Sequence, residues 1–180
     1  MTKRPNILFI MTDQQRFDAL SCHGGLARTP NLDRLAGQGV DVRTCIAQSP
    51  VCGPSRSNLF SGRYPHSTGC VQNSFRYTRH EPHLFKVLKH AGYQLGYFGK
   101  NHVLEEDQFA HFEQADFCKG AANHPQGEAF AQFSRAAGQR MREQGCWAGA
   151  TFHDFPEEVT STGRIGRGAL DYLGHKSPDD

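Results

Sequence analysis

Short apolar runs alternate with helix-forming segments over the first 100 residues, and this alternation leaves few folds open to the chain. Residues 6–11 form a continuous apolar run, which is typical of a strand covered on both faces. The runs at 40–47 and 93–98 also predict strands. Strands separated by helices favour parallel pairing. We therefore expect an α/β fold with a mostly parallel central sheet and helices on both faces.

Prolines and glycines place the helices between these strands. The pair Thr29-Pro30 puts a cap residue before a first-turn proline and predicts a helix that ends at Gly37 or Gly39. Further helices are expected over 54–61 and 82–91, each opened by a proline.

The second half of the chain has weaker patterns. Residues 1–103 contain the motifs described below, whereas 104–160 are rich in Gln, His, Phe and Gly and are interpreted as an insertion or surface segment. A helix is expected near 127–142, broken by Gly138. Residues 161–180 are interpreted as a final helix followed by a truncated end.

Charge and cysteine content exclude several classes of protein. Twenty Lys plus Arg against eighteen Asp plus Glu give a net charge of +2, which favours neither nucleic acid nor an anionic membrane as a partner. No apolar run approaches the roughly 20 residues of a membrane span. The run at 7–11 is too short for a secretory signal, so we expect a cytoplasmic protein. The six cysteines include no C-x-x-C pair, which argues against a zinc ribbon.

Residues 51–63 are the densest cluster of chemically useful side chains. Cys52 precedes a helix whose first turn is fixed by Pro54, and the unpaired amides and dipole of a helix start favour a negatively charged group there. Arg56, one turn on, can point its guanidinium towards the same place. Two interpretations stay open from these residues alone: an activated thiol at an anion site, or a buried cysteine with Arg56 in a surface ion pair.

Polar residues also follow two of the predicted strands. Asp13 comes directly after the first, at the position where open α/β sheets bind ligands. Lys100 and His102 follow the strand at 93–98. Each could equally be a solvated turn or loop residue.

The residues from Cys52 to Arg63 resemble C-x-P-S-R-x-x-x-L-x-x-G-R, the signature of the type I sulfatases, a family within the alkaline phosphatase superfamily. Three more segments, 5–14, 29–36 and 92–102, are similar to conserved stretches of that family and occur in the same order. The resemblance implies an alkaline-phosphatase-like fold, of which this chain would carry the N-terminal part.

The resemblance also implies a hydrolase mechanism. A maturation enzyme would oxidise Cys52 to formylglycine, whose hydrate attacks the sulfur of a small-molecule or saccharide sulfate ester. Arg56 would steady the hydrate, and Lys100 and His102 would contact the hydrate and the sulfate. Asp13, Gln14 and the modified Cys52 would bind a divalent metal, calcium in the first place and magnesium or manganese as alternatives.

Two departures from the family keep alternatives open. Gln14 stands where many members have a second aspartate, a variant similar to choline sulfatases and phosphonate monoester hydrolases, so a phosphonate or phosphate ester hydrolase is an alternative. The family takes further metal ligands from a later part of a longer chain. His111, His124, His153 and His175 match none of these ligands. A non-catalytic or incomplete fragment is therefore the second alternative, and we expect little activity from these 180 residues alone.

A small basic cluster completes the candidates. Arg76, Arg79 and His80 are expected near the rim of the site, where they either help to capture an anion or form ordinary surface.

Overall fold

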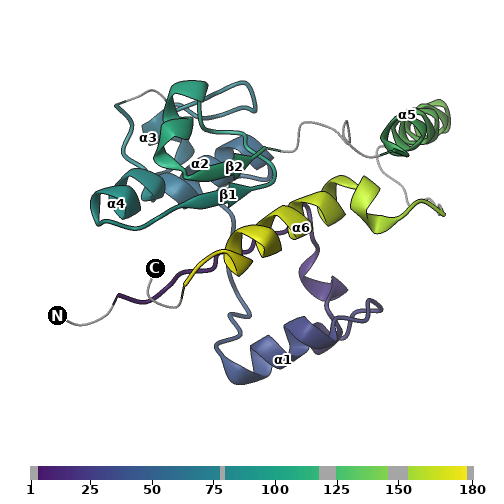
Figure 1. Cartoon of the computed structure of the whole chain (residues 1–180), viewed down its shortest axis with the longest axis horizontal. Helices are drawn as coiled ribbons and strands as arrows, with labels where there is room; N and C mark the ends of the chain where they lie inside the picture. The colour runs from purple at the N-terminus through teal and green to yellow at the C-terminus, as the bar shows by residue number, and fades with distance from the viewer. Residues whose placement is uncertain (1–3, 78–79, 118–124, 146–153, 178–180) are drawn as a thin grey trace.

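The computed structural model describes residues 4–77, 80–117, 125–145 and 154–177. Its elements follow one another along the chain (Figure 1). The α-helices are α1 (Pro30–Gln38), α2 (Cys52–Ser61), α3 (Pro65–Thr68), α4 (Leu84–His90), α5 (Gly127–Glu143) and α6 (Ser161–Gly174). The strands are β1 (Gly96–Phe98) and β2 (Gln114–Asp116), and the 3₁₀ turns are η1 (Phe17–Ala19), η2 (Ser21–His23), η3 (Glu106–His111) and η4 (Glu157–Val159).

The two strands pair in parallel. Gly96 lies opposite Gln114 and Phe98 opposite Asp116. The pairing continues one residue further, where the Gly99 amide donates to the Asp116 carbonyl at 2.8 Å. Because the chain must cross over to pair in parallel, η3 and its flanking loops connect the two strands. Strand β2 therefore lies within the 104–160 segment.

Helices cover both faces of this small sheet, as the alternation of side chains along β1 requires. On one face Tyr97 packs against Phe85 of α4, with ring centroids 5.6 Å apart. On the other face Phe98 packs against Tyr172 of α6 at 5.6 Å. The strands lie between these two layers in Figure 1. The expected α/β fold with parallel strands and helices on both faces is confirmed.

The hydrophobic core lies between α2, α4 and the residues around β1. Six buried side chains form it: Phe60, Tyr77, Leu95, Val103, Leu104 and Phe112. Phe60 comes from α2, while Val103 and Leu104 come from the segment after β1. The core therefore fixes the helix that begins at Cys52 against the chain that carries Lys100 and His102.

Helix α6 reaches the sheet closely because β1 begins with a glycine. A Cβ atom at Gly96 would lie 2.7 Å from the Tyr172 ring. At the next contact along α6, a Cβ atom at Gly168 would lie 3.2 Å from the Phe98 ring. Small residues on both elements thus let the two aromatic rings interdigitate.

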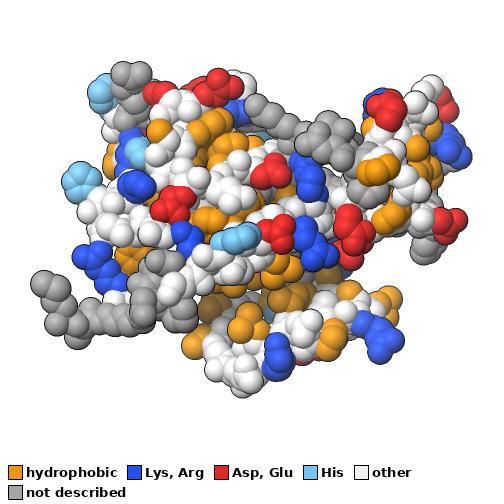
Figure 2. Space-filling view, in the orientation of Figure 1, with side chains coloured by type: hydrophobic (Ala, Val, Ile, Leu, Met, Phe, Trp, Pro, Cys, Tyr) orange, Lys and Arg blue, Asp and Glu red, His pale blue; other side chains and the backbone are white. Residues whose placement is uncertain are grey.

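Two of the predicted strands, 6–11 and 40–47, are wrong. Neither segment forms a strand with any other described residues, and both expose their apolar side chains. Ile10 is 73% exposed and Val40 is 90% exposed. An apolar run shows that a segment can be buried, but a strand also needs a neighbour for its backbone hydrogen bonds. Figure 2 shows apolar side chains at the surface between α6 and α1.

The later helices differ in detail from the predictions. Helix α5 continues through Gly138, because one glycine lowers helix propensity without breaking the hydrogen-bond pattern. Helix α6 begins at Ser161, after Thr160, whose hydroxyl accepts a hydrogen bond from the Gly163 amide at 3.0 Å. Within the described residues, no helix is both long and apolar enough to span a bilayer.

Candidate active site

Helix α2 begins at Cys52, two residues before the predicted start. The Ser55 amide donates to the Val51 carbonyl at 2.9 Å, which makes Val51 the N-cap. Cys52 is partly buried and Pro54 is buried, so the first turn is packed against the protein. The cysteine is therefore held at the start of a helix, as the first interpretation of the sequence requires.

Asn73 pairs with one of the backbone amides at the start of α2, which were expected to be unpaired. Its side-chain oxygen accepts a hydrogen bond from the Gly53 amide at 2.7 Å and lies 3.3 Å from the Cys52 sulfur. A Cβ atom at Gly53 would lie only 2.8 Å from the same oxygen, so a side chain there would displace Asn73. Sequence reasoning missed Asn73, since it lies in a loop 21 residues from Cys52. The one signal in the motif that could have indicated this contact is Gly53, because only a residue without a side chain leaves room for Asn73.

Arg56 is buried and points to the segment after β1. Its Nη1 donates to the Lys100 carbonyl at 3.0 Å, across 44 residues of sequence. The Tyr97 hydroxyl donates to the same carbonyl at 2.9 Å. The alternative in which Arg56 makes a surface ion pair is thus wrong, because the guanidinium is 7% exposed and bonds to backbone.

Lys100 and Asp13 form an ion pair between segments 87 residues apart, with Nζ donating to a carboxylate oxygen at 2.5 Å. This hydrogen bond is the main reason why the pKa of Asp13 is lowered, although burial opposes the shift. The charge of Arg56 lowers it further. Asp13 therefore stays ionised within a group of positive residues.

His102 lies in the same electrostatic group. Its pKa is lowered first by burial and then by the charges of Lys100 and Arg56, while Asp13 opposes the shift. Its Nδ1 atom is buried and makes no hydrogen bond to the described part of the chain. The ring is therefore neutral near pH 7 and has a nitrogen able to accept a proton.

Gln14 adopts a left-handed backbone conformation, with φ of 52°. It is the single non-glycine residue with positive φ in the described ranges. Such backbone strain is concentrated at ligand-binding positions, and here it stands directly beside Asp13.

The donors at positions 13 and 14 suit a hard cation, because a carboxylate and an amide oxygen are the ligands that such cations prefer. They are too few to hold one alone. Across the described ranges, no group of three or more His, Cys, Asp or Glu side chains could hold a metal ion. The two residues therefore fit as part of a ligand set.

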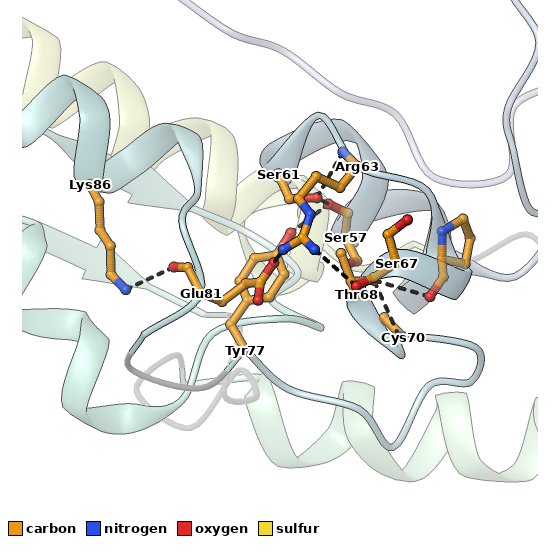
Figure 3. Close-up of polar contacts among 10 residues, drawn as sticks. Ser57, Ser61, Arg63, Ser67, Thr68, Cys70, Tyr77, Glu81 and Lys86 are labelled. Atoms are coloured by element: carbon orange, nitrogen blue, oxygen red, sulfur yellow. Dashed lines mark hydrogen bonds and ion pairs between the residues drawn. The ribbon is translucent and has the colours of Figure 1, made fainter.

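A polar scaffold behind α2 holds its second half in place (Figure 3). The Tyr77 hydroxyl and the Ser61 hydroxyl both donate to the Ser57 carbonyl, at 2.5 and 2.7 Å. Just past the helix, Arg63 forms an ion pair with Glu81 at 2.5 Å. These contacts tie the helix that presents Cys52 to the loops around residues 77 and 81.

The remaining candidates do not join the site. His111 packs against His83, and the His175 ring bonds to the Asp171 carbonyl of its own helix. Arg76 bonds through Nη1 to three backbone carbonyls, and its expected part in capturing an anion at the rim stays a prediction. His124, His153 and Arg79 lie outside the described residues.

A family model described as Sulfatase matches residues 5–164. The chain belongs to the sulfatase family. It is 36% identical over 145 residues to an N-acetylglucosamine-6-O-sulfatase of Bacteroides thetaiotaomicron, a match that covers 80% of this chain and 25% of that protein. It is also 35% identical over 133 residues to human steryl-sulfatase, covering 67% of this chain and 22% of that one. The sulfatase chain thus spans about a quarter of the length of these curated relatives.

Two solved structures are similar to this sulfatase chain. One, a complex with its substrate D-glucosamine-2-N,6-O-disulfate, aligns with a TM-score of 0.60 and 38% identity over 66% of this chain and 24% of the other. A phosphonate monoester hydrolase of Agrobacterium radiobacter aligns with a TM-score of 0.70 over 97% of this chain and 39% of the other. Because its identity is 21%, the second match shows the fold alone, which is alkaline-phosphatase-like.

Proposed function

We propose that this chain carries the nucleophile and its neighbouring cations in a hydrolase of sulfate monoesters. One observation carries the proposal: Asp13, Arg56 and Lys100 converge from three distant segments, two of them linked by a 2.5 Å ion pair. Arg56 belongs to the helix that begins at Cys52. The motif cysteine and the positive charges that a sulfate ester needs are therefore parts of one unit.

The proposed nucleophile is the hydrate of formylglycine made from Cys52. One of its hydroxyl oxygens forms a bond to the sulfur of the ester while the bond from sulfur to the alcohol oxygen breaks. The second hydroxyl then loses its proton, the bond between carbon and the sulfate oxygen breaks, and the aldehyde forms again as sulfate leaves. A serine at this position could attack but has no second hydroxyl with which to expel sulfate.

The neighbouring residues then have distinct tasks. Lys100 supplies a positive charge to the sulfonyl oxygens, on which negative charge accumulates in the transition state. His102, kept neutral by its lowered pKa, accepts or returns a proton. Arg56 acts through the Lys100 carbonyl, which it holds in place, and its charge adds to the field at Asp13.

The finer cofactor proposal is a divalent cation, Ca²⁺, with Asp13 and Gln14 among its oxygen ligands. When bound, the ion would add fixed positive charge beside the sulfonyl oxygens. The modified Cys52 is the third proposed ligand, and further ligands would come from beyond the described residues.

The proposed substrate is a sulfated saccharide. This rests on the N-acetylglucosamine-6-O-sulfatase and on the solved complex with a glucosamine disulfate, to which this chain is similar. A formylglycine-generating enzyme is the proposed maturation partner. The cytoplasmic location stays a prediction.

The test is coexpression with a formylglycine-generating enzyme, followed by mass analysis of the peptide that contains residue 52. We expect loss of the thiol and capture of an aldehyde by a hydrazide at Cys52, while Cys45 stays a thiol. Arg56→Ala, which alters the motif, should prevent the conversion. A persistent thiol at Cys52 would contradict the proposal.

A phosphonate or phosphate ester hydrolase is the second candidate, favoured by the neutral Gln14 beside Asp13. The oxidised chain, used in excess over substrate, should react with an aryl sulfate faster than with a phosphonate or phosphate monoester of the same phenol. Faster release of phenol from either phosphorus ester would favour the second candidate.

A further inference from the structure

Arg76 connects the two segments that carry the proposed site. Its Nη1 donates to the carbonyls of Asn73 and Phe75, both at 2.8 Å, and to the carbonyl of His102 at 2.9 Å. The last contact spans 26 residues of sequence. A single guanidinium nitrogen thus links the loop that follows α3 to the segment that follows β1 by hydrogen bonds.

On the first side Arg76 acts on Cys52 through Asn73. The backbone of Asn73 is held by Arg76, and its side chain bonds to the Gly53 amide at 2.7 Å and lies 3.3 Å from the Cys52 sulfur. Asn73 is an exposed loop residue, so the guanidinium bond to its carbonyl is one of the few contacts that hold its backbone near the cysteine.

On the second side Arg76 acts on the backbone of His102. The Nδ1 atom of that ring makes no hydrogen bond within the described part of the chain, so the Nδ1 side of the ring is not oriented by a polar partner. The backbone contact to Arg76 therefore helps to decide where the ring lies relative to the start of α2.

Arginine suits this task better than lysine. Its planar, permanently charged group offers donors in a fixed arrangement, whereas a lysine ammonium is a compact point charge on a flexible stem. Bonds from a charged donor are also shorter and stronger than neutral ones.

We propose that Arg76 is a positioning residue that sets the placement of residue 52 relative to His102. The proposal rests on the function proposed above, in which both residues act in one reaction. Arg76 itself touches neither the thiol nor the imidazole in this arrangement, so it is not a catalytic residue.

The test is cysteine alkylation by iodoacetamide in the unoxidised chain, with the rate at each cysteine followed by peptide mass analysis. In Arg76→Met the Cys52 rate should rise about threefold or more, because Asn73 no longer shields the thiol. Cys70 is fully buried and reports unfolding of the same molecule, and its rate should not change. Arg63→Met is the matched control, since Arg63 also donates to a backbone carbonyl but lies at the other end of α2.

A second readout is the NMR chemical shift of the His102 ring protons, which should change in Arg76→Met and stay the same in Arg63→Met. Arg76→Lys, the milder variant, should give intermediate changes in both readouts. It serves as the test of the proposal if the Met variant unfolds. An unchanged Cys52 rate, or Cys52 and Cys70 rates that rise together in both variants, would overturn the proposal. Neither readout needs an aldehyde or turnover, so it can fail while the proposed hydrolase activity stands, and the reverse.

Discussion

His83 is an ionisable side chain in an apolar environment. It is 2% exposed, stacks on Tyr77 with ring centroids 5.3 Å apart, and makes no hydrogen bond through either ring nitrogen within the described residues. Burial, with smaller effects from the charges of Lys86 and His111, lowers its pKa from 6.5 to about 4. The folded protein thus keeps a neutral imidazole where the unfolded chain would bind a proton.

This makes the free energy of unfolding depend on pH. Because the folded pKa lies below the unfolded one, His83 lowers stability progressively as pH falls from 6.5 towards 4, by roughly 3 kcal/mol in all. His83→Phe keeps a ring of similar size and should lose this dependence. Urea unfolding at pH 7.5 and pH 5 should show the variant gaining about 2 kcal/mol on the wild type between the two values. Parallel losses in both proteins would show that His83 is not responsible.

Part of the site's make-up follows from the sequence. Three family-like segments point to Cys52, Asp13 and Lys100, and the structure brings the last two into contact, while their roles stay predictions. It could not reveal Asn73, because a loop residue that bonds through one amide oxygen has no characteristic spacing. It also could not reveal the contacts of Arg76, because whether an arginine faces solvent or backbone carbonyls depends on tertiary packing.

At the scale of elements, Tyr77 links α2 to the segment that carries His102. Its hydroxyl donates to the Ser57 carbonyl at 2.5 Å, and its amide donates to the Val103 carbonyl at 2.6 Å. Tyr77→Phe removes the first bond, but the Ser57 carbonyl still accepts from Ser61. We therefore expect a loss of only about 1 kcal/mol in the free energy of unfolding. The exposed Tyr64→Phe is the matched control and should change nothing; a similar loss in both would contradict this role for Tyr77.

The contact between β1 and α6 depends on Gly96. Gly96→Ala would place a methyl group 2.7 Å from the Tyr172 ring and should destabilise the protein by about 1–3 kcal/mol. Gly166→Ala is the control on α6, since a Cβ atom there meets nothing within 4 Å. It should be neutral or stabilising by up to about 1 kcal/mol, because alanine favours a helix. Thermal unfolding of both variants checks the difference, and equal melting temperatures would show that α6 yields to the added methyl.

Elements differ in how far the sequence determines them. Helix α1 and helix α2 follow from local proline, cap and glycine signals, and both predictions were right to within two residues. The segments 6–11 and 40–47 carry equally clear apolar patterns but form no strand. A helix bonds to itself, whereas a strand depends on a neighbour that its own residues do not specify.

At the scale of the whole molecule, those two segments leave a large apolar surface. Seven side chains there are more than half exposed: Ile7, Leu8, Phe9, Ile10, Val40, Val42 and Ile46. Exposed apolar side chains in such number promote association. We expect the chain to self-associate as its concentration rises in sedimentation velocity.

Substitution tests the source of this association. Ile10→Lys with Ile46→Lys should shift the chain towards monomer. Val71→Lys with Leu170→Lys adds the same charge at other exposed apolar positions and should have a smaller effect. Equal shifts in both double variants would mean that added charge, rather than the apolar surface, controls association.

In the unliganded protein, the ion pair between Lys100 and Asp13 competes with ligands for both side chains. A cation that takes the carboxylate frees the lysine, and an anion that takes the lysine frees the carboxylate. Whichever arrives first breaks the pair, so the other then binds more tightly, and thermodynamic reciprocity makes the two enhancements equal. Both side chains are partly exposed, 38% and 47%, which limits the coupling to about fivefold. Because Asp13 and Gln14 are too few to hold Ca²⁺ tightly, NMR titration at high ligand concentrations is the measurement: Ca²⁺ with and without sulfate, and sulfate with and without Ca²⁺, should return the same factor.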